Sequence, residues 1–151
     1  MNYFDTSALI KAFLVEVGTD TAKQLLLRGG MAATATITYA EMYSGFSRKK
    51  REGGLTRKHY DAVCEAFESY WPACVQVELT KALLTFARDL MQRHPLRAFD
   101  AIHVASALSL KQDLGEALTI IAADERLLQA AKAEQLRTVD VERVQNSRGS
   151  N

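Results

Sequence analysis

The stretch LTIIAAD, residues 118–124, decides the fold class of this chain of 151 residues. Residues 118–122 are apolar apart from one β-branched threonine, which is typical of a short strand buried on both faces. They run into Asp124 and then into a segment with helical spacing that reaches about Gln135. A buried strand followed at once by a helix predicts a parallel sheet covered by helices, and therefore an α/β fold.

The rest of the chain repeats this alternation of short strands and longer helices. Further strands are expected at residues 2–4, 31–37, 75–77 and, at an edge of the sheet, 138–141. Helices are expected at residues 7–15, 19–27, 38–52, 56–71, 79–91 and 98–110. No repeat or linker divides the sequence, so we predict one domain at residues 1–144 and a polar, mobile tail at 145–151.

Composition excludes several classes of protein. The net charge is only +1, so any nucleic-acid surface must come from local clustering of basic residues. Two cysteines and three scattered histidines have no zinc-type spacing and argue against a disulfide framework. The first residues lack the basic segment of a signal peptide, and no apolar run has the length of a membrane span. We therefore expect a cytoplasmic protein without a membrane partner.

Four acidic residues follow the predicted strands. Asp5 and Asp124 come directly after two of them, whereas Glu41 and Asp100 lie in the first turns of two helices. In a parallel sheet the carboxyl ends of the strands lie at one edge, and ligands bind there. The four carboxylates are therefore expected to converge.

Each acid also has a purely structural explanation. Asp5 and Asp124 suit the N-cap position of a helix, and Thr38 with Glu41 has the spacing of a capping box. Asp100 in a first turn is favoured by the helix dipole. These capping roles and a functional role remain alternatives at this point.

The conjunction of the four acids favours a metal site. Carboxylates set in apolar sequence repel one another unless a cation joins them. Ligand sets made only of oxygen select Mg²⁺ or Mn²⁺, which can activate water for hydrolysis of a phosphodiester bond. A phosphatase on the same fold is one alternative, although Asp5-Thr6-Ser7 lacks the second aspartate of a D-x-D motif. A non-catalytic interaction module is the other.

Four stretches together resemble the PIN-domain nucleases, and in particular the VapC toxins of bacterial toxin–antitoxin pairs. The stretches are DTSALI at 5–10, Glu41, FDAIHVASAL at 99–108 and ADERL at 123–127. The resemblance implies a three-layer α/β/α sandwich around a short parallel sheet. It also implies an endoribonuclease that depends on Mg²⁺ or Mn²⁺, acts on RNA, forms a homodimer and is inhibited by a small cognate antitoxin.

By the same resemblance, Asp5, Glu41 and Asp100 are the principal catalytic acids and metal ligands, and Asp124 completes the site through water. The chain departs from the family at Ala122, where a threonine or serine is common two residues before the last acid. Asp124 is therefore expected to matter less than the other three acids.

Seven further residues are candidates for supporting roles. Thr6 and Ser7 offer hydroxyl groups beside the metal, and His103 follows Asp100 by one helical turn. We expect His103 to support or pack rather than to bind metal, because histidine ligands usually come with partners. The basic run Arg48, Lys49, Lys50 and Arg51 is either a solvated helix end or a surface that contacts the RNA backbone.

Overall fold

Five parallel strands form the sheet at the centre of the molecule, which we describe over residues 1–143 from a computed structural model. The strands are β1 (Asn2–Phe4), β2 (Ala32–Ala35), β3 (Val75–Val77), β4 (Thr119–Ala122) and β5 (Arg137–Asp140), in the spatial order β3-β2-β1-β4-β5. Every pairing is parallel, which confirms the predicted α/β fold, and β5 is an edge strand as expected. The predicted tail at 145–151 lies outside the described residues.

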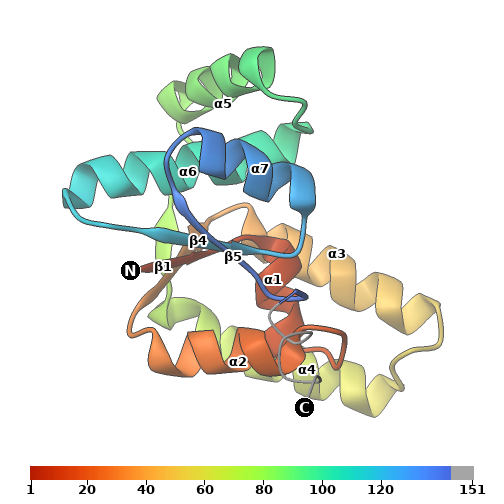
Figure 1. Cartoon of the computed structure of the whole chain (residues 1–151). Helices are drawn as coiled ribbons and strands as arrows, with labels where there is room; N and C mark the ends of the chain where they lie inside the picture. Colours follow the sequence, from red (N-terminus) through yellow and green to blue (C-terminus); the bar gives the residue numbers. More distant parts are fainter. Residues whose placement is uncertain (144–151) are drawn as a thin grey trace.

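Helices cover both faces of the sheet and make three layers (Figure 1). The helices are α1 (Thr6–Leu9), α2 (Thr19–Arg28), α3 (Thr38–Arg51), α4 (Arg57–Tyr70), α5 (Lys81–Arg93), α6 (Ala98–Leu114) and α7 (Glu125–Ala133). Two short 3-10 segments, Ile10–Ala12 and Trp71–Ala73, follow α1 and α4. No helix in the described part of the chain is long and apolar enough to cross a membrane.

Alternation along the strands builds a separate core on each face. Tyr3 and Ile120 point to one side, where they pack with apolar residues of α5, α6 and α7. The next residues, Phe4 and Ile121, point to the other side and pack with α1, α2, α3 and α4. Successive side chains of a strand face opposite ways, so a sheet covered on both faces needs apolar residues at every position. This requirement explains the unbroken apolar run at 118–122.

The first helix is shorter than predicted. Helical spacing suggested residues 7–15, but α1 ends at Leu9 and the 3-10 segment ends at Ala12. Val15 is 89% exposed, so it does not continue the apolar face of a helix. The chain turns instead, because the Thr19 hydroxyl accepts from the backbone N–H of Glu16 and donates to the carbonyl of Leu14.

The strand order places a topological switch point beside the first strand. From β1 the chain builds outward through β2 to β3, and it then returns to place β4 on the other side of β1. The connections that leave β1 and β4 therefore diverge, and a crevice opens at their carboxyl ends. Asp5 follows β1 and Asp124 follows β4, so both lie at this crevice.

Candidate active site

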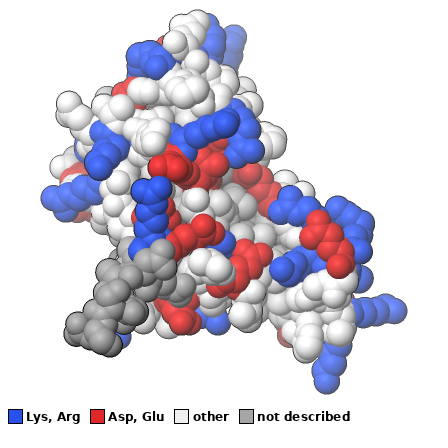
Figure 2. Space-filling view, turned by 45° about the vertical axis from the view of Figure 1, so that its right-hand side comes forward, with Lys and Arg blue, Asp and Glu red and all other residues white. Residues whose placement is uncertain are grey.

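The structure brings the four predicted acids together. Asp5, Glu41, Asp100 and Asp124 all line one pocket of about 540 Å³. They arrive from the ends of β1 and β4 and from the first turns of α3 and α6. Figure 2 shows acidic side chains grouped in the middle of one face, with basic side chains around them.

Asp5 is both a helix cap and a member of this pocket. Its side chain accepts from the backbone N–H of Ser7 at 3.1 Å and from the Ser7 hydroxyl, which confirms the predicted N-cap. The Ser7 hydroxyl also accepts from the backbone N–H of Ala123 at 2.9 Å, so it ties the end of β1 to the end of β4. Burial raises the pKa of Asp5, although His103 and Ser7 oppose the shift. The cap and the pocket are compatible roles.

Glu41 does not form the predicted capping box. The N-cap of α3 is Ile37, and Thr38 already lies inside the helix with its hydroxyl turned to that of Thr34 at 2.7 Å. Glu41 accepts instead from the Thr6 hydroxyl at 2.8 Å and contacts His103 at 2.8 Å. Burial acts to raise the pKa of Glu41, but these two partners outweigh it and hold the pKa below its ordinary value. The side chain is thus directed into the site.

His103 is buried between two of the acids and has a polar partner on each ring nitrogen. Its Nε2 lies 2.8 Å from Glu41 Oε1 and 3.3 Å from Asp5 Oδ1, while Nδ1 lies 2.9 Å from the Tyr3 hydroxyl. Burial acts to lower the pKa of His103, but the charges of Asp5 and Glu41 outweigh it and raise the pKa. The histidine thus contacts two carboxylates through one ring nitrogen and the Tyr3 hydroxyl through the other, and its supporting role stays a prediction.

Arg97 joins the other two acids and was missed by sequence reasoning. Its Nε donates to Asp100 at 3.0 Å, and its Nη2 donates to Asp124 at 3.2 Å. Asp124 also caps α7 by accepting from the backbone N–H of Leu127, as predicted. The i, i+3 spacing of Arg97 and Asp100 was a signal in the sequence, but contact with Asp124 depends on the tertiary fold.

Two nitrogen-bearing side chains of the protein therefore join these carboxylates in pairs. His103 joins Asp5 to Glu41, and Arg97 joins Asp100 to Asp124. Within residues 1–143 no three acidic, histidine or cysteine side chains are already spaced as a ligand set for a metal ion. The chemistry of the pocket nevertheless fits Mg²⁺ or Mn²⁺, because it offers four carboxylates, three hydroxyls and no thiolate.

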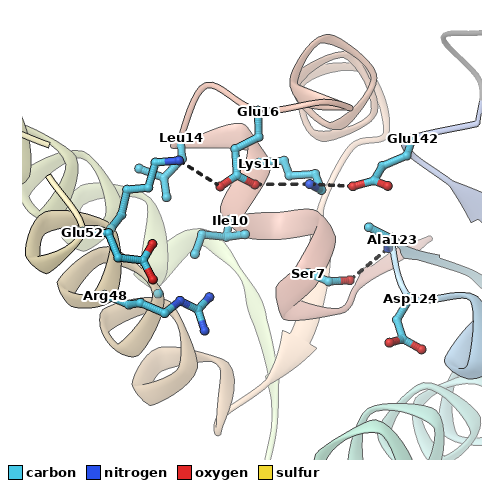
Figure 3. A pocket seen from close by; sticks show the side chains of 12 residues that line it. Ser7, Ile10, Lys11, Leu14, Glu16, Arg48, Glu52, Ala123, Asp124 and Glu142 are labelled. Carbon is cyan, nitrogen blue, oxygen red and sulfur yellow. Dashed lines mark hydrogen bonds and ion pairs between the residues drawn. The ribbon is translucent and has the colours of Figure 1, made fainter. Parts of the chain in front are cut away.

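A second pocket, of about 350 Å³, adjoins the acidic one and receives part of the basic run (Figure 3). Arg48 lines both pockets, and its side chain extends from α3 into the space opposite Asp124. Lys49 also lines the second pocket, where it lies 3.9 Å from Glu16, whereas the Lys50 ammonium lies over the ring of Tyr60. Of the run, Arg48 is the residue placed beside the acids.

Known proteins resemble this chain in both sequence and fold. The PIN domain pattern matches residues 3–133. The protein named ribonuclease VapC45, of Mycobacterium tuberculosis strain CDC 1551 / Oshkosh, is 32% identical over 108 residues, which are 72% of this chain and 75% of that protein.

Two solved structures share the fold at lower identity. FitAcB from Neisseria gonorrhoeae is 18% identical, with a TM-score of 0.64 over 93% of this chain and 98% of that one. A toxin–antitoxin complex from Klebsiella pneumoniae is 19% identical, with a TM-score of 0.62 over the same shares. At these identities the likeness shows the three-layer architecture.

Proposed function

The chain belongs to the PIN-domain family, and we propose that it is a metal-dependent endoribonuclease of the VapC type, the toxin of a toxin–antitoxin pair. The observation that carries the proposal is the convergence of four carboxylates in one pocket at the switch point of the sheet. A relative that covers most of this chain is named a ribonuclease, which favours RNA over the small phosphate esters of a phosphatase.

Asp5, Glu41 and Asp100 would hold the Mg²⁺ or Mn²⁺ ion, with Asp124 acting through water. Such an ion activates a water molecule and neutralises charge on the phosphodiester. The protein's own contribution is to hold the carboxylates in place. Ser7 donates to Asp5, while Thr6 and His103 hold Glu41, so these acids enter the site already oriented.

The direct test is cleavage of RNA by the purified protein. We expect internal cuts in RNA with Mg²⁺ or Mn²⁺ and none in EDTA, because the carboxylates alone provide no activated water. Mapping of the new RNA ends would define the cleavage site. Hydrolysis of phosphomonoesters without any cut in RNA would contradict the proposal and favour the phosphatase.

We also propose that a small antitoxin binds this chain and places a cation, in our view an arginine, on the acids. The fold is shared with a protein solved in a toxin–antitoxin complex, and a pocket that carries four carboxylates has a strong complement in a guanidinium group. Co-expression with the neighbouring gene should yield a stable complex with at least about tenfold lower nuclease activity. An uninhibited protein that cells tolerate at full activity would contradict this proposal. The predicted homodimer stays a prediction.

Arg48 is the residue of the basic run that we expect to contact the RNA backbone. Arg48→Ala should weaken RNA binding by about three- to tenfold and reduce the slope of its salt dependence by about one, because one phosphate contact is lost. Arg51→Ala is the matched control, since Arg51 is an exposed arginine of the same helix that lines neither pocket. Equal effects of the two changes would show that the basic run contributes only general surface charge and that Arg48 has no specific contact with the RNA backbone.

A further inference from the structure

Arg97 lines the acidic pocket with a side chain that is largely exposed to solvent. It is the residue before α6, its backbone is extended, and its side chain is 70% exposed. One guanidinium group nevertheless reaches Asp100 on α6 and Asp124 at the start of α7. Arg97 also lines an adjoining hollow with Glu125, Arg126 and Gln129, so that it faces two open surfaces.

Stability gives a poor account of this bridge. The Arg97 side chain is 70% exposed, although Asp100 is only 12% and Asp124 26% exposed. An ion pair with an exposed guanidinium contributes little to folding, because water solvates that charge and a long side chain loses conformational freedom. α7 is already capped by Asp124 through Oδ1, whereas Arg97 contacts Oδ2 of the same group. The helix therefore begins correctly without the arginine. What the bridge does provide is a cation held within reach of two carboxylates of the proposed site.

A guanidinium and a divalent cation compete for the same oxygens. Arg97 Nε binds Asp100 Oδ2, and Asp100 is one of the carboxylates proposed to hold the metal. Once a metal neutralises these acids, the attraction between them and Arg97 weakens. The freed group is then an arginine beside a nucleic-acid site, and a planar guanidinium pairs with phosphate through two parallel hydrogen bonds.

We propose that Arg97 is a substrate-binding residue that changes partners: it holds Asp100 and Asp124 until a divalent cation binds them, and it then donates to a phosphate of the RNA strand. This inference rests on the proposed nuclease function. Arg97 occupies the acids before the metal arrives, so it lowers the apparent affinity for metal. It then adds positive charge where negative charge develops on the phosphate.

The two roles can be separated because they act in opposite directions on two measurements. Arg97→Gln should raise the affinity for Mn²⁺, measured by calorimetry without RNA, by roughly three- to tenfold, since a competitor is removed. The same change should lower the rate of RNA cleavage at saturating Mn²⁺ by about a hundredfold, the usual cost of losing one donor to a developing anion. Arg97→Lys keeps the charge but not the paired donors, so it should recover only part of the rate.

Arg126→Gln is the matched control, because Arg126 is an exposed arginine on α7 that lines the adjoining hollow but not the acidic pocket. It should leave both measurements unchanged. If Arg97→Gln lowers Mn²⁺ affinity and cleavage together, Arg97 is a tether that positions Asp100, and the inference is wrong. If neither changes, the bridge is only a surface ion pair. A wild-type protein that binds Mn²⁺ but never cuts RNA would overturn the nuclease function, and the inference with it.

Discussion

Asp5→Asn and Asp100→Asn should each lower metal-dependent RNA cleavage by at least about a thousandfold, while the fold is retained. Each change removes one negative charge from the proposed ligand set, and metal catalysis of this kind depends on several kcal/mol of electrostatic stabilisation. Glu41→Gln should behave in the same way. Asp124→Asn should cost less, because that residue is expected to reach the metal through water.

Asparagine is the informative substitution because it separates charge from capping. Asp5 caps α1, and asparagine caps a helix about as well as aspartate does. The variant therefore keeps the cap and loses the negative charge that faces the proposed metal and His103. Asp20→Asn is the matched control, because Asp20 lies in the first turn of α2, as Asp100 does in α6, but outside the acidic pocket. Circular dichroism and thermal melting would verify the fold of each variant.

Cleavage rates of the purified variants at several Mn²⁺ concentrations are the decisive measurement. If the loss in Asp100→Asn is partly recovered at high Mn²⁺, the residue acts on metal binding, whereas a loss that persists at every concentration indicates a role in the chemical step. Near-normal cleavage by both Asp5→Asn and Asp100→Asn would show that the carboxylates are structural and that the nuclease site is elsewhere.

The fold was predictable because its main signal is local. The apolar run at 118–122 and the helical spacing that follows it report burial on both sides of a strand, and β4 with α7 is the result. The convergence of four acids was predictable for a topological reason, since parallel strands place their carboxyl ends at one edge. The end of α1 was not, because Val15 has an apolar side chain that the tertiary structure leaves in solvent.

The residues that contact the four acids were harder to predict from the sequence than the acids themselves. The contact between His103 and Glu41 joins residues 62 positions apart, and the contact between Arg97 and Asp124 joins residues 27 apart. A capping box was expected at Thr38 because its spacing is correct, but the helix begins one residue earlier than that motif requires. Sequence spacing identifies which groups can interact. The tertiary fold, which packs α3 against α1 and brings Glu41 of α3 to His103 of α6, selects among them.

The second large effect is expected on stability, when the buried polar contacts of His103 are removed. Its ring is 1% exposed and contacts Asp5, Glu41 and the Tyr3 hydroxyl. His103→Leu would leave a buried carboxylate without its partner and the Tyr3 hydroxyl without an acceptor or donor on the ring. A buried polar group that loses its hydrogen-bond partner costs about 1–3 kcal/mol, and more when the group is charged. We therefore expect a fall of about 3 kcal/mol in the free energy of unfolding in EDTA.

Tyr3→Phe tests the outer half of the same network. It removes one hydrogen bond and leaves the contacts between His103 and the acids in place, so about 1 kcal/mol should be lost. His94→Leu is the matched control: His94 contacts Glu134 in a more exposed position away from the acids, and its removal should cost less than about 1 kcal/mol. Urea unfolding in EDTA would rank the three variants.

Divalent metal should then act selectively on the His103 variant. In wild type the histidine joins Asp5 to Glu41, whereas in His103→Leu these carboxylates lack that partner and an added cation can take its place. A ligand that binds the native state alone stabilises it as its concentration rises, so Mn²⁺ should raise the melting temperature of both proteins. The increase should be larger in His103→Leu, because there Mn²⁺ also relieves the unpaired carboxylates. Equal shifts in His103→Leu and His94→Leu would mean that His103 packs in the core without acting on the acids, since a histidine that orients metal ligands cannot be removed without changing how the metal stabilises the fold.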